Sequence, residues 1–109
     1  MTDKRIVLST AGSEDEARKI AQALVGRRLA ACVNILGPIH SVYRWKGAVE
    51  SAPEHLLIIK TTVSAFSRVR DAIRELHSYE LPECVVLSVE TGSEDYLRWI
   101  DESVNRKVE

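Results

Sequence analysis

The segment Leu76–Glu83, LHSYELPE, carries more reactive side chains than a connection between a helix and a strand needs. Neutral imidazole is a good ligand for copper and zinc, so His77 is a candidate metal ligand, with Cys32 and Glu83 as further candidates. A structural role for His77 is the alternative, because a histidine in the last turn of a helix can bond to the terminal carbonyl groups. The residues alone leave both readings open.

A second group combines aromatic and oppositely charged side chains that lie far apart in the sequence. Such a group could line a ligand pocket between subunits, where small-molecule sites often occur. It could also supply only the aromatic and arginine anchors of an oligomer interface, and the absence of a phosphate-binding glycine motif in TAGSED favours this simpler reading. The group consists of Tyr43, Arg44, Trp45, Lys60, Tyr79 and Glu83.

Composition restricts the classes of protein to which the chain can belong. Its 109 residues suit one domain spanning 1–109, and 15 basic against 16 acidic residues predict no nucleic-acid partner. No apolar run is long enough for a membrane span, and the beginning MTDKRIVLSTAG does not resemble a secretory signal, so a cytoplasmic protein is expected. Cys32 and Cys84 form no C-x-x-C pair and are expected to be reduced, buried thiols.

Hydrophobic periodicity and turn residues predict four strands and three helices. Ser13 with Glu16 forms a capping box for the first helix, and Gly26 is expected to be its C-cap residue. Thr62 is expected to cap the second helix, and Ser93 the last one. The predicted strands cover 4–10, 29–45 with an interruption at Gly37–Pro38, 48–60 after a turn at Lys46–Gly47, and 84–89, which is apolar enough to be central.

The order β-α-β-β-α-β followed by a helix predicts an α+β, ferredoxin-like fold with both main helices on one face of an antiparallel sheet. The hairpin between Leu29 and Lys60 is too long for such a sheet, with roughly 13–17 residues per arm against the usual 6–8. Its tip carries Val42, Trp45 and other apolar side chains that need to be covered. A second copy of the chain would cover them most simply, and a projecting ribbon that binds a neighbour can close a ring.

Five segments together resemble the CutA family of divalent-cation-tolerance proteins, over about Ile6 to Ile100. The resemblance implies a ferredoxin-like subunit, a homotrimer built by the long hairpins, and a PII-like shape. It also implies an association with tolerance of copper and other divalent metals, and copper binding in some members. It does not imply a settled biochemical activity. The segments are RLAACVNI, SVYRWKGAVE, HLLIIKT, LHSYELPE and YLRWI.

The family pattern His-x-Tyr-x-x-Pro-Glu falls on the segment 77–83, which the resemblance marks as a metal-binding candidate through His77. Leu76 stands where some relatives carry a second histidine, and Ser9 where some carry a cysteine. With His77 and Cys32 as the soft ligands, copper or another divalent cation is expected to bind weakly.

The sequence therefore predicts a non-enzymatic homotrimer associated with divalent-metal tolerance, without an organic cofactor, a nucleic-acid partner or a membrane partner. The alternative is a PII-like sensor that binds a small molecule in an intersubunit cleft. An enzyme that uses Cys32 and His77 as nucleophile and base is the weakest hypothesis, because no third orienting group accompanies them.

Overall fold

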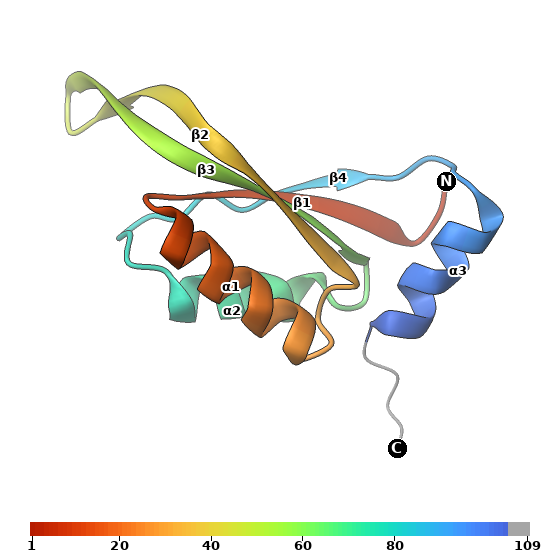
Figure 1. Cartoon of the computed structure of the whole chain (residues 1–109). Coiled ribbons are helices and arrows are strands. Elements are labelled where there is room, and N and C mark those ends of the chain that lie inside the picture. Colours follow the sequence, from red (N-terminus) through yellow and green to blue (C-terminus); the bar gives the residue numbers. More distant parts are fainter. Residues whose placement is uncertain (105–109) are drawn as a thin grey trace.

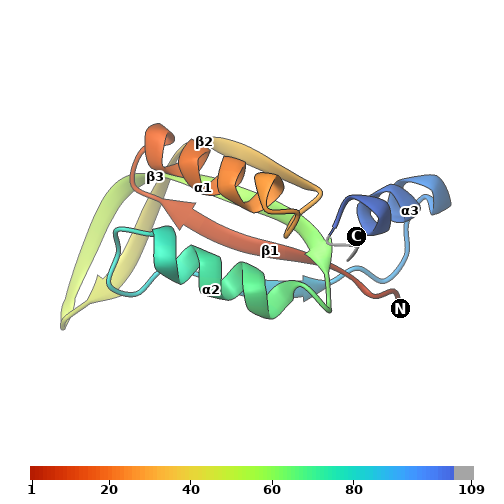
Figure 2. The same ribbon diagram turned by 90° about the horizontal axis from the view of Figure 1, so that it is seen from below.

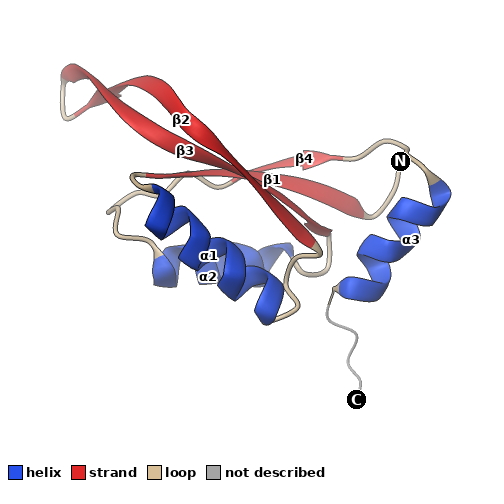
Figure 3. Ribbon diagram, in the orientation of Figure 1, coloured by secondary structure: helices blue, strands red, loops and turns tan. Residues whose placement is uncertain are grey.

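The computed structural model describes residues 1–104, and these form four strands and three helices (Figures 1 and 3). The predicted types and order of the elements are confirmed. The elements are β1 (Lys4–Ala11), α1 (Glu14–Gly26), β2 (Cys32–Trp45), β3 (Ala48–Thr62), α2 (Phe66–Leu76), β4 (Val85–Ser88) and α3 (Glu94–Ser103).

The strands form one antiparallel sheet in the order β2-β3-β1-β4. Helices α1 and α2 lie side by side on one face of this sheet, and α3 packs at the end opposite the hairpin tip (Figures 1 and 2). This is the ferredoxin-like α+β arrangement that the element order predicts. No helix in the described part of the chain is long and apolar enough to cross a membrane.

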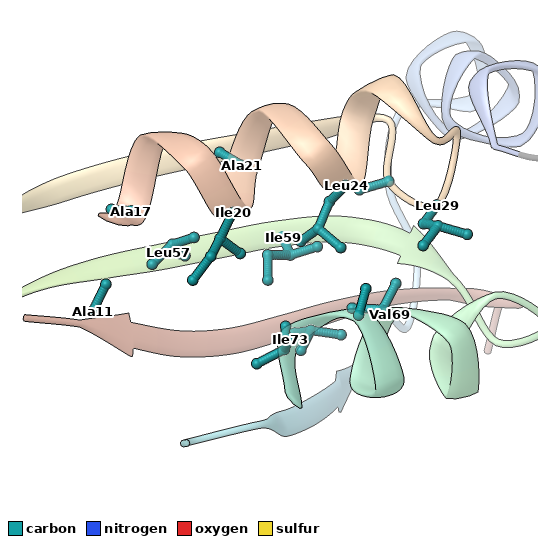
Figure 4. Packing of buried hydrophobic residues seen from close by; sticks show 13 residues of the cluster. Ala11, Ala17, Ile20, Ala21, Leu24, Leu29, Leu57, Ile59, Val69 and Ile73 are labelled. Carbon is teal, nitrogen blue, oxygen red and sulfur yellow. The ribbon is translucent and has the colours of Figure 1, made fainter. Parts of the chain in front are cut away.

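The core lies between the two helices and the sheet (Figure 4). Helix α1 contributes Ile20 and Leu24, and α2 contributes Val69 and Ile73, at spacings that keep each pair on one helix face. Leu57 on β3 meets them from the sheet and is fully buried. Each such side chain stabilises the fold by about 1.5–3 kcal/mol.

The first helix begins as predicted and ends at Gly26, but its C-cap is the next residue. Ser13 Oγ accepts a hydrogen bond from the Glu16 N–H at 3.1 Å, which confirms the N-cap. The predicted C-cap at Gly26 is wrong by one residue, because Arg27 is the C-cap and its N–H bonds to the Ala23 carbonyl. Arg28 takes the positive φ of 59° instead of a glycine, and its guanidinium bonds to the Glu102 carbonyl at 2.9 Å.

The second helix does not begin at Thr62. Thr62 is the last residue of β3 and pairs with Lys4, which keeps its backbone extended. A turn follows, in which the Ala65 N–H bonds to Thr62 Oγ1 at 3.3 Å, and the helix begins at Phe66. Thr62 therefore caps a turn before the helix. The predicted cap of α3 at Ser93 is confirmed, since Ser93 Oγ accepts from the Tyr96 N–H at 3.5 Å.

The hairpin of β2 and β3 projects far beyond the helices (Figure 1). Pairing between β1 and β3 stops at Ala11 and His55, so the part from Ile39 to Glu54, called the ribbon below, has only two strands. The predicted turn is confirmed, since Lys46 and Gly47 have positive φ angles of 50° and 84°. A two-residue turn of this kind matches the twist of the two strands.

The predicted central position of the fourth strand is wrong. β4 is short, pairs only with β1 and lies at the edge of the sheet. Its apolar side chains Val85, Val86 and Leu87 are exposed in the single subunit. An apolar run in a strand predicts burial, and here the subunit itself does not supply the cover.

Candidate functional site

His77 lies at the C-terminal cap of α2, and its side chain is completely buried. Its Nε2 lies 2.6 Å from the Thr10 carbonyl oxygen on β1. Its Nδ1 accepts a hydrogen bond from the Tyr79 N–H at 3.1 Å. Because a carbonyl can only accept, these partners assign the neutral tautomer with the proton on Nε2.

This geometry does not fit a metal site within one subunit. Both ring nitrogens of His77 are used, so no lone pair is free for a cation. The described residues contain no group of three His, Cys, Asp or Glu side chains that could hold a metal ion, so His77, Cys32 and Glu83 do not form one. His77 also does not bond to the carbonyl groups of its own helix through its ring; it connects the end of α2 to β1.

Glu16 is a neighbour of His77 that sequence reasoning placed only in a capping box. Its Oε2 accepts a hydrogen bond from the Ser78 N–H at 2.7 Å and lies 3.5 Å from His77 Nδ1. Burial opposes ionisation of this carboxyl, but the hydrogen bonding from Ser78 lowers its pKa below the ordinary value. Glu16 therefore holds the start of the segment 77–83 against α1.

Tyr79 connects this segment to the ribbon. Its hydroxyl donates to Glu54 Oε2 at 2.7 Å, and its ring lies 4.5 Å from the His77 ring. Burial and the Glu54 carboxylate raise the pKa of Tyr79, so the hydroxyl keeps its proton and remains a donor. A Cβ at Gly12 would lie 3.0 Å from the Tyr79 hydroxyl, so the glycine allows this close approach.

Glu54 is a residue of the candidate site that sequence reasoning missed. It is 8% exposed, and a buried carboxylate is rare without a partner. The sequence offers only a weak signal for it, because Glu54 is one of several polar residues in this strand, which also carries Glu50 and His55.

A groove of about 700 Å³ opens between the ribbon and the segment 79–83. Neighbouring residues of a strand point to opposite faces, so Glu54 faces this groove while His55 lines a second hollow beside α1. The groove is lined by Thr10, Ser41, Val42, Tyr43, Arg44, Trp45, Glu54, Tyr79, Glu80, Leu81, Pro82 and Glu83.

Five of the six residues of the predicted cleft line this groove. The exception is Lys60, which lies on β3 within the four-stranded part of the sheet, opposite Cys32 and Ile6. Its Nζ lies 5.9 Å from the centre of the Tyr96 ring on α3. The sequence could not separate Lys60 from the others, because all six share aromatic or charged chemistry and only the register of the hairpin decides which of them meet.

The two cysteines are free, and both are half-buried rather than fully buried as expected. Cys32 begins β2 at one edge of the sheet, and Cys84 precedes β4 at the other edge. Burial still raises the pKa of the Cys84 thiol, which disfavours the reactive thiolate.

Comparison with known proteins gives one consistent result. Residues 5–103 match the model of the CutA1 divalent ion tolerance protein family. The divalent-cation tolerance protein CutA of Thermus thermophilus is 46% identical over 100 residues, which cover 92% of this chain and 97% of the relative.

Two solved structures agree with this match. The divalent cation tolerance protein from Thermus thermophilus superposes with a TM-score of 0.92 at 45% identity, covering 94% of this chain and 99% of the other. The periplasmic divalent cation tolerance protein CutA from Archaeoglobus fulgidus has a TM-score of 0.91 at 41% identity, covering 94% of this chain and 99% of the other. That name places the archaeal relative in the periplasm, so a cytoplasmic location for this chain stays a prediction.

Proposed function

Because the chain belongs to the CutA1 divalent ion tolerance protein family, we propose that it acts as a non-enzymatic homotrimer that binds a small molecule in the ribbon groove. The carrying observation is the meeting of five predicted cleft residues, from two distant segments, in one groove of about 700 Å³. This volume lies within the range of ordinary small-ligand sites, and the combination of aromatic walls with a few polar groups is typical of them. The function is thus the PII-like sensor rather than a metal carrier.

Assembly is part of the proposal, because one subunit leaves much apolar surface uncovered. Val42 at the ribbon is 67% exposed, and the side chains of β4 are exposed at the opposite edge of the sheet. A two-stranded ribbon is marginally stable in water without a packing partner. A ring of three copies would cover both regions, and light scattering at micromolar concentration tests it against the subunit mass of 12.2 kDa. A monomeric mass would contradict the assembly.

Weak copper binding at His77 stays a prediction of the sequence, and the geometry of one subunit argues against it. A copper ion would have to displace the Tyr79 N–H from Nδ1 or the Thr10 carbonyl from Nε2. Titration of Cu(II) into the wild type and His77→Ala, with His40→Ala as a control on the ribbon, separates the cases. Loss of copper binding in His77→Ala but not in His40→Ala would support a metal site at His77 over the small-molecule hypothesis.

The ligand hypothesis is tested through tryptophan fluorescence. The chain has two tryptophans, so Trp99→Phe leaves Trp45 as the single reporter, and Trp45 lines the groove. A panel of nucleotides, amino acids, dicarboxylates and amines is titrated into this variant. A saturable change with at least one compound class is expected. A groove that responds to none of them would contradict the proposed function.

A further inference from the structure

The charge of the ribbon groove differs from the one that the sequence suggests. The predicted cleft contained two cations, Arg44 and Lys60, against one carboxylate. Lys60 lies elsewhere in the structure, and Glu54 and Glu80 join Glu83 in the lining. Three carboxylates now face one guanidinium, which disfavours a phosphate or another anion and favours a cation.

Glu54 is the group that gives this charge a defined position. The residue is 8% exposed, and Tyr79 donates to only one of its oxygens, Oε2. Oε1 receives no hydrogen bond from the residues that the structure describes. Oε1 is not one of the side-chain atoms that are sealed from solvent without a partner, so a ligand in the groove that carries an N–H donor can reach it.

The Tyr79 hydroxyl cannot donate a hydrogen bond to a ligand while it donates to Glu54. Its raised pKa keeps it protonated, and its proton is committed to Glu54. The bond also fixes the orientation of the carboxylate, because Tyr79 is held by its own N–H at His77. A positioned carboxylate of this kind loses little freedom when a second donor arrives.

The walls of the groove suit the same ligand chemistry. Tyr43, Trp45 and Tyr79 supply aromatic rings, which attract ammonium groups through their faces. Val42 and Leu81 add apolar surface for a carbon chain. Glu80 and Glu83 form no ion pair among the described residues, so their charges remain available.

We propose that the ribbon groove binds a small organic cation, with a primary ammonium group on Glu54 Oε1 and a short carbon chain along the aromatic wall. This inference rests on the proposed function and names its ligand class. The ammonium group would donate to Glu54, and Glu80 or Glu83 would neutralise a second positive charge on the same chain.

The test uses 1,4-diaminobutane as the probe and Trp45 fluorescence in Trp99→Phe as the signal, with calorimetry as an independent measure. Saturable binding is expected, with an affinity that falls as salt screens the carboxylates. Glu54→Gln should weaken binding at least tenfold. The matched control is Glu75→Gln on α2, a carboxylate that pairs with Arg27 and should leave the affinity unchanged.

Glu83→Gln provides a variant that does not disturb the fold, because the Glu83 side chain has no hydrogen bond or ion pair in the described structure. It should weaken the diamine by several fold even if Glu54→Gln folds poorly. Equal affinities in the wild type, Glu54→Gln and Glu83→Gln would overturn the inference, and so would no binding of the diamine at all.

The outcomes also distinguish this inference from the proposed function. If a nucleotide or dicarboxylate changes the Trp45 signal and the diamine does not, the groove is a ligand site and the cation inference is wrong. If no compound changes the signal, both are wrong, as they would be if a side chain of a second copy fills the groove.

Discussion

The helix-covered half of the sheet and the ribbon share the strands β2 and β3, yet their apolar side chains are covered to different extents. In the covered half, Leu57 and Ile59 of β3 are fully buried under α1 and α2 (Figure 4). On the ribbon, Val42, Trp45 and Val49 remain exposed. The apolar side chains of the first region are buried within one subunit, whereas those of the second need a partner outside the subunit to cover them.

The boundary between the two regions is where polar groups are concentrated. Tyr79 joins the buried His77 on one side to Glu54 at the base of the ribbon on the other. Fixed groups at the edge of a rigid core can hold a ligand in one geometry, whereas groups at the ribbon tip lack such support. The candidate site therefore lies where the helix-covered core meets the ribbon, and variants on the two sides of this boundary are expected to have different effects.

The largest effect is expected for truncation in the covered half. Leu57→Ala removes a fully buried side chain and should lower the free energy of unfolding by about 2–5 kcal/mol. Leu36→Ala is the matched control, because Leu36 lies on the hairpin and is 45% exposed. Denaturant unfolding at fixed protein concentration measures both. A cost for Leu36→Ala as large as that for Leu57→Ala would show that a neighbour buries the hairpin as deeply as the core.

The next effect concerns assembly. Trp45 and Trp99 are 37% and 42% exposed in one subunit, so a difference between their alanine variants reports on what a neighbour covers. Trp45→Ala should raise the dissociation constant of the proposed trimer at least tenfold, or about 1.4 kcal/mol, because Trp45 lies at the ribbon tip. Analytical ultracentrifugation over a dilution series measures this. Stronger dissociation in Trp99→Ala would move the main contact to α3.

A smaller effect is expected at the boundary. Tyr79→Phe removes the donor to the buried Glu54 carboxylate and should cost about 1 kcal/mol of unfolding free energy. Tyr43→Phe is the control, because the Tyr43 hydroxyl makes no hydrogen bond among the described residues. If the two variants unfold at the same denaturant concentration, the link between the ribbon and the segment 79–83 contributes nothing to stability.

The smallest effect depends on pH. The pKa of Glu16 is lowered in the folded state from an ordinary value of 4.5, so its stabilisation is present above that value and is lost as the pH falls through the folded pKa. Glu16→Gln should therefore be less stable than the wild type at pH 7, by about 0.5–1 kcal/mol. The difference in stability should narrow as the pH falls below 4.5 and through the lowered folded pKa of Glu16. A stability difference that is independent of pH would mean that the hydrogen bond from the Ser78 N–H does not require an ionised Glu16.

Much of the fold could be predicted because its signals are local. Alternating and helical periodicities locate the elements, and Ser13 and Ser93 cap helices through atoms three residues away. The errors come from interactions that are not local. Thr62 stays in β3 because Lys4 pairs with it, and Arg28 replaces Gly26 as the positive-φ residue while bonding to Glu102.

The residue types of the candidate site could be predicted from the sequence, but the hydrogen-bond partners of these residues could not. His77 and Tyr79 stand out in the sequence, but the bonds that decide their chemistry reach Thr10 and Glu54 on other strands. Lys60 was grouped with the cleft because the sequence does not show whether a charge falls in the ribbon or in the four-stranded part of the sheet. Only the register of the strands assigns Glu54 to the groove and Lys60 to α3.

The position of β1 has a consequence for the order in which the chain can assemble. β1 is the first strand in the sequence but an inner strand of the sheet, where Lys4 pairs with Thr62 and Arg5 with Ser88. The ribbon closes from Trp45 and Ala48 at its turn and needs only short loops. During synthesis the two strands of the ribbon can therefore pair early. Both edges of β1 stay unpaired until β3 and then β4 have left the ribosome.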